Sequence, residues 1–117
     1  MADMQRVTDL PVLLIYDIDP SWTAAEQDQA NRACQRLGYA MRRQGHSVRF
    51  LPVSDPDLHS VLARYDPRDV IVFNWCEGLP GIERSEVWVA ETLERLRFTY
   101  TGASPDVLKL SYDKPQV

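Results

Sequence analysis

Two aspartates, Asp17 and Asp19, follow the apolar run "VLLIY" and are the first residues of this sequence that could do chemistry. Paired carboxylates at the end of a strand can bind Mg²⁺, because oxygen atoms are the ligands that this ion prefers. In a loop before a helix, however, acidic residues are also common simply because they interact favourably with the helix dipole. The second interpretation is favoured here, since the next equivalent run ends in Asn74 and supplies no third carboxylate.

A second polar segment, "NWCEGLPG", follows the apolar run "VIVF". Cys76 could be a nucleophile, but no histidine lies near it in the sequence, and an isolated cysteine after a strand is more often a small buried hydrophobic residue. Glu77 is followed by Gly78, and a glycine allows a ligand to approach the backbone closely. The pair is therefore either a ligand contact or a plain turn.

The elements that must position these residues alternate along the chain. Thr23 and Glu26 have the spacing of a capping box, which starts a helix, and Gly45 suits the end of that helix. Asp55 before Pro56 predicts the start of a second helix. The expected strands cover 12–16, 47–53, 70–74 and 98–102, and the expected helices cover 23–44, 55–65, 85–97 and 104–112.

Strands that alternate with helices predict a mostly parallel sheet with helices on both faces. We expect one α/β domain over residues 1–117: a Rossmann-like or flavodoxin-like three-layer αβα fold with four parallel strands in the order 2-1-3-4. Ligands bind such sheets beyond the carboxyl ends of the strands, where the strand order reverses. This point lies between the first and third strands, so both polar segments are expected beside it. The glycine-rich fingerprints of dinucleotide and P-loop sites are missing.

The composition limits the classes of function. Apolar residues make up 44% of the chain, charged residues 26%, and the net charge is -4, so we expect no nucleic-acid or membrane partner. Two well-separated cysteines and the lack of a secretion signal predict a cytoplasmic protein. Without a basic groove, the three tryptophans are expected in the core or in an interface rather than as a stacking platform.

The last 50 residues carry a family resemblance. The segments "VFNWCEG" and "RSEVWVAETLERLRFTYTGASPDVLKLSYDK" resemble the N-terminal domain of the D-alanine–D-alanine ligase family of ATP-grasp ligases. The resemblance implies a pre-ATP-grasp domain, the first of three, in a longer enzyme that uses ATP and Mg²⁺. It assigns Lys114, in the terminal Asp-Lys pair, to contact ATP.

The same resemblance implies an ATP-dependent carboxylate–amine ligase, which forms an acyl phosphate that an amine then attacks. The substrate-binding residues would be Glu26, Glu77 and Gly78, facing an amino-acid-like substrate. Glu26 would correspond to a family glutamate that holds the substrate's amino group, although the capping box explains Glu26 equally well. The 117 residues alone are expected to be inactive, and a homodimer is possible.

Two other interpretations remain open at this point. The chain could be a freestanding flavodoxin-like binding module that contacts a partner through the carboxyl ends of its strands. It could also be a degenerate phospho-acceptor domain that uses Asp17 and Asp19. The binding module is the stronger of the two, because the phospho-acceptor interpretation lacks an aspartate at position 74.

Overall fold

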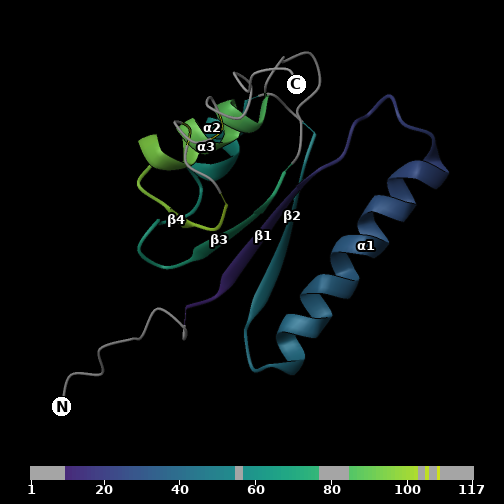
Figure 1. Cartoon of the computed structure of the whole chain (residues 1–117), viewed down its shortest axis with the longest axis horizontal. Helices are drawn as coiled ribbons and strands as arrows, with labels where there is room; N and C mark the ends of the chain where they lie inside the picture. Colours follow the sequence, from purple (N-terminus) through teal and green to yellow (C-terminus); the bar gives the residue numbers. More distant parts are fainter. Residues whose placement is uncertain (1–9, 55–56, 77–84, 103–104, 106–107, 109–117) are drawn as a thin grey trace, which may run out of the picture.

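The computed structural model describes residues 10–54, 57–76, 85–102, 105 and 108. Its four strands form one parallel sheet in the order β2-β1-β3-β4, which Figure 1 shows edge to edge. This confirms the predicted α/β class, strand order and Rossmann-like or flavodoxin-like fold. The strands are β1 (Val12–Asp17), β2 (Val48–Val53), β3 (Ile71–Trp75) and β4 (Thr99–Tyr100).

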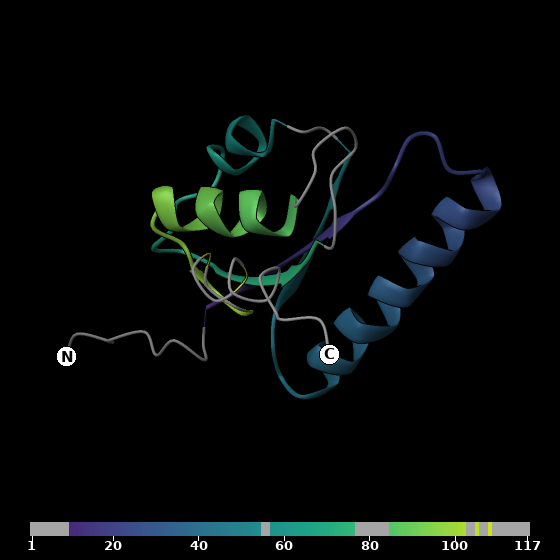
Figure 2. The same ribbon diagram turned by 45° about the horizontal axis from the view of Figure 1, so that its top comes forward.

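The helices cover both faces of the sheet (Figures 1 and 2). Helix α1 (Ala24–Arg43) lies on one face, and α2 (Leu58–Leu62) and α3 (Ser85–Arg95) lie on the other. Because side chains alternate along a strand, β1 serves both layers. Its Leu13 and Ile15 pack with α2 and α3, whereas Leu14 and Tyr16 pack with α1.

Helix α1 begins as predicted, at a capping box. The backbone N–H of Glu26 donates to Thr23 Oγ1 at 3.1 Å, and the backbone N–H of Thr23 donates to Glu26 Oε1 at 3.0 Å. Gly45 follows the helix with φ of 97°, a backbone conformation that glycine adopts at little cost. The turn after α1 therefore also agrees with the sequence.

The predicted start of the second helix is wrong by two residues. Asp57, rather than Asp55, is the N-cap of α2, and its carboxylate accepts from the backbone N–H of Ser60 at 3.2 Å. The physical reason is capping: the Asp57 carboxylate accepts from both the backbone N–H and the hydroxyl of Ser60, and this satisfies a free donor of the first turn. Asp55 and Pro56 lie outside the described residues.

Helix α1 does not lie evenly on the sheet. Gly38 is buried over the ring of Phe50 on β2, with no room for a Cβ atom between them. Figures 1 and 2 show the N-terminal end of α1 standing farther from the strands than its C-terminal end. The helix and the sheet therefore form a wedge that opens toward the carboxyl ends of β1 and β3.

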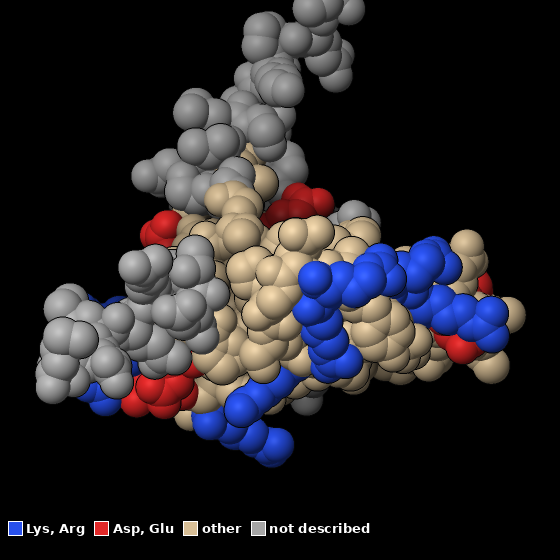
Figure 3. Space-filling view, turned by 90° about the horizontal axis from the view of Figure 1, so that it is seen from below, with Lys and Arg blue, Asp and Glu red and all other residues tan. Residues whose placement is uncertain are grey.

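Helix α1 is rich in exposed arginines. The helix carries four exposed arginines, and Figure 3 shows a row of basic side chains over this part of the molecule. Arg42 stacks over the rings of Tyr39 and Phe50, 5.6 and 5.1 Å from their centroids, and donates to the Val48 carbonyl at 2.7 Å. Arg42 is therefore packed against β2 although it is exposed. The four residues are Arg32, Arg36, Arg42 and Arg43.

Candidate ligand pocket at the carboxyl ends of β1 and β3

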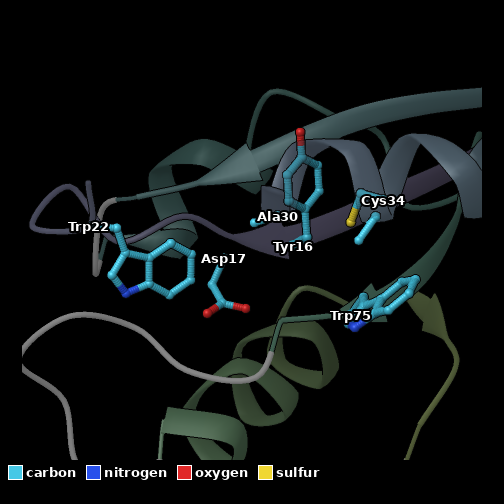
Figure 4. Close-up of a pocket in the computed structure, with 7 residues that line it drawn as sticks. Tyr16, Asp17, Trp22, Ala30, Cys34 and Trp75 are labelled. Carbon is cyan, nitrogen blue, oxygen red and sulfur yellow. The ribbon is translucent and has the colours of Figure 1, made fainter. Parts of the chain in front are cut away.

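The wedge between α1 and the sheet holds a pocket of about 130 Å³ (Figure 4). It lies at the carboxyl ends of β1 and β3, the position at which the strand order reverses and open α/β sheets bind ligands. In the view of Figure 4 the Asp17 carboxylate lies between the indoles of Trp22 and Trp75. The lining residues are Tyr16, Asp17, Trp22, Ala30, Ala33, Cys34 and Trp75.

Small residues on α1 leave the space of the pocket open. Ala30 and Ala33 face the sheet where the helix has moved away from it, and their methyl groups are too short to fill the gap. On the opposite wall, Tyr16 and Trp75 are direct partners in the register of β1 and β3. The pocket thus lies between a helix face of small residues and a sheet face of aromatic residues.

The loop between β1 and α1 places Trp22 at the mouth of the pocket. The backbone N–H of Trp22 donates to the Asp19 carbonyl at 3.0 Å, and Gln27 Nε2 donates to the Trp22 carbonyl at 3.0 Å. The Asp19 carboxylate accepts from the backbone N–H and the hydroxyl of Ser21, at 2.8 and 2.7 Å. These bonds lower the pKa of Asp19. Asp19 therefore shapes the loop, whereas Asp17 lines the pocket.

The pocket has one carboxylate and two neutral acids. Burial raises the pKa of the Cys34 thiol to about 11, and the negative charge of Asp17 adds to this effect. Burial also raises the pKa of Tyr16, whose hydroxyl donates to Asn31 Oδ1 at 2.7 Å. None of the described lining residues is cationic. Among the described lining residues the pocket therefore has one acidic carboxyl group, that of Asp17, and no basic side chain.

Glu26 lies beside this pocket rather than in it. A second hollow of about 280 Å³ continues along α1 and is lined by Trp22, Glu26, Gln29, Ala30 and Ala33. One oxygen of the Glu26 carboxylate closes the capping box, and the side chain is exposed. The structure therefore places Glu26 at the rim, in a hollow that shares Trp22 with the pocket of Asp17.

The other predicted site residues, Glu77, Gly78 and Lys114, lie outside the described residues. Cys76 is 5% exposed and packs in the core layer of α2 and α3, and its backbone N–H donates to Asn74 Oδ1 at 3.1 Å. This confirms the interpretation of Cys76 as a small buried hydrophobic residue.

No metal site or membrane span is present in the described part of the chain. Within it, no three His, Cys, Asp or Glu side chains gather in a group that could hold a metal ion. Over the same residues, none of the helices has the length and apolar character needed to cross a bilayer. The first of these findings gives no support to a phospho-acceptor site built on Asp17 and Asp19.

Sequence reasoning missed the aromatic walls of the pocket. Trp22 and Trp75 are half-buried and also pack against the α1 core layer, so their assignment to the core was correct but incomplete. Trp88, on α3, is 37% exposed. The strand-end rule that located the two polar segments could also have identified Tyr16 and Trp75, since Trp75 is the last residue of β3 and Tyr16 is the last but one of β1. Comparisons of the chain with protein-family models, curated proteins and solved structures find no match.

Proposed function

We propose that this chain is the N-terminal, substrate-side domain of an ATP-dependent carboxylate–amine ligase. The observation that carries the proposal is the parallel sheet in the order 2-1-3-4 with a pocket at its point of reversal. The resemblance of the last 50 residues to the D-alanine–D-alanine ligase family agrees with this arrangement. In the proposed enzyme, an amino-acid-like substrate lies along the carboxyl ends of β1 and β3, next to Glu26.

The described residues do not supply a site for Mg²⁺–ATP. They include neither a metal-holding group of acidic residues nor a glycine-rich phosphate loop. In this proposal the nucleotide contact from this chain is Lys114, a long cation suited to a phosphate group. When bound, ATP would activate the substrate carboxylate. The part of this domain is to bind and orient the substrate.

Expression of the complete reading frame tests the proposal. ADP release is measured with pairs of amino acids as substrates, D-alanine among them, for the unchanged protein and for Lys114→Ala. We expect Lys114→Ala to lose most of the activity while Lys109→Ala, a matched removal of a nearby lysine, keeps it. Residues 1–117 alone should release no phosphate. ATP turnover by residues 1–117, or equal activity of the two lysine variants, would contradict the proposal.

A freestanding binding module is the second candidate, and one observation favours it. The pocket is lined by described residues of this one chain, so a ligand could bind without any further domain. A reading frame that ends at Val117, together with ligand binding by this chain, would support the module and exclude the ligase.

A further inference from the structure

We propose that the pocket between α1 and the carboxyl ends of β1 and β3 binds an alkylated ammonium group of a small molecule. The ligase proposal lays a substrate along the carboxyl ends of β1 and β3 with its amine at Glu26, on the rim, but it names no chemical group for the inner pocket. The inference rests on the lining of the pocket alone, so it does not depend on whether the chain belongs to a ligase.

The walls of the pocket match the chemistry of an alkylated cation. The faces of tryptophan and tyrosine rings attract cations through their quadrupoles, tryptophan most strongly, and aromatic walls of this kind recognise quaternary ammonium groups. Here Trp22 and Trp75 stand at opposite ends of the pocket, and Tyr16 lies between them on β1 (Figure 4). Three aromatic residues thus line one small space.

The charge of the pocket points to the same ligand. Asp17 supplies a carboxylate, and Tyr16 and Cys34 keep their protons at neutral pH. The four arginines of α1 are exposed and are not among the residues that line the pocket, and no described lining residue is positively charged. An anion would be repelled by Asp17, whereas a cation is attracted by Asp17 and by the aromatic rings.

The size of the pocket selects a head group rather than a whole ligand. Pockets for drug-sized molecules have volumes of roughly 300–1,000 Å³, whereas this one has about 130 Å³. The neighbouring hollow of about 280 Å³ shares Trp22, Ala30 and Ala33 with it. A compact alkylated ammonium therefore fits the inner pocket, and the rest of the molecule extends along α1.

The direct test is titration of the 117-residue protein with choline. Binding is monitored by tryptophan fluorescence and by the indole N–H signals in NMR spectra. The neutral analogue 3,3-dimethylbutan-1-ol has the shape of choline without its charge, and ethanolamine has a charge without the methyl groups. We expect choline to shift the Trp22 and Trp75 signals and to leave Trp88 unchanged. Equal binding of the neutral analogue, equal binding of ethanolamine, or no binding of choline would overturn the proposal.

Two variants test the residues that we assign. Asp17→Asn removes the charge at constant size, and we expect choline binding to weaken by about tenfold or more. Trp22→Leu removes an aromatic wall near the surface and should weaken binding similarly, whereas Trp88→Leu, on the opposite layer, should not. Circular dichroism confirms that each variant is folded. Unchanged choline affinity in folded Asp17→Asn and Trp22→Leu would contradict the assignment.

Discussion

Gly38 on α1 lies directly over the aromatic ring of Phe50 on β2, so close that a Cβ atom at position 38 would overlap Cζ and Cε1 of Phe50. This contact fixes the place where the helix touches the sheet. The pocket opens from this point toward the N-terminal end of α1, because the helix diverges from the strands in that direction. The close packing at one end and the pocket at the other are two consequences of a single helix orientation.

Replacement of Gly38 by alanine should destabilise the protein. Alanine favours a helix over glycine by about 1 kcal/mol, but the added methyl overlaps a packed ring, and overpacking typically costs about 1–3 kcal/mol. We expect a net loss in the free energy of unfolding, measured in urea. Phe50→Leu makes room for the methyl, so the double variant should lose less than the two single variants together. A stabilised Gly38→Ala protein would show that the ring moves aside freely.

The capping box allows the structural and functional roles of Glu26 to be separated. Thr23→Ala removes an N-cap and should lower the free energy of unfolding by about 1 kcal/mol. Glu26→Gln should leave stability within about 0.5 kcal/mol, because glutamine also serves at this position of a capping box. If Glu26 holds a substrate amine, the same Glu26→Gln change should raise KM for that substrate in the complete enzyme. An unchanged KM would restrict Glu26 to its capping role.

A partly buried hydrogen bond joins Tyr16, in the wall of the pocket, to α1. The Tyr16 hydroxyl donates to Asn31 Oδ1 at 2.7 Å, and a bond of this kind contributes about 1 kcal/mol to stability. A double-mutant cycle with Tyr16→Phe and Asn31→Ala should therefore give a coupling energy of about 1 kcal/mol. The exposed bond from Tyr100 to Glu94, at 2.8 Å, is the control, and Tyr100→Phe should change stability by less. Zero coupling between Tyr16 and Asn31 would contradict this account.

The sequence predicted the sheet because its signals are local and repeated. Apolar runs such as 12–16 alternate with helix starts such as Thr23 and Glu26, and right-handed crossovers then restrict the strand order. The position of the polar loops followed from that order. The start of α2 was misplaced because Asp55 and Asp57 are both suitable N-caps, and the sequence does not show which carboxylate accepts from a free backbone N–H of the first turn.

The pocket itself could not be predicted, because it depends on the tilt of a helix. Ala30 and Ala33 indicate the inward face of α1 but not its distance from the sheet. That distance is set by the contact between Gly38 and Phe50, which are 12 positions apart in the sequence and lie on different elements. Trp75 also belongs to β3 rather than to the loop after it, so its ring is fixed in the wall of the pocket.

The buried thiol of Cys34 should make stability fall at high pH. Its pKa is raised from 9.0 to about 11 by burial and by Asp17, so between these values the unfolded chain loses a proton that the folded protein keeps. Stability from this group is then complete below pH 9 and is lost as the pH rises toward 11. In Cys34→Ala the decline in the free energy of unfolding between pH 9 and pH 11 should be shallower than in the unchanged protein. In the unchanged protein, iodoacetamide should modify Cys34 slowly at pH 8, because little of the thiol is present as thiolate. Identical pH profiles for the two proteins, or modification of Cys34 as fast as that of a free thiol, would show that the pKa of Cys34 is not raised.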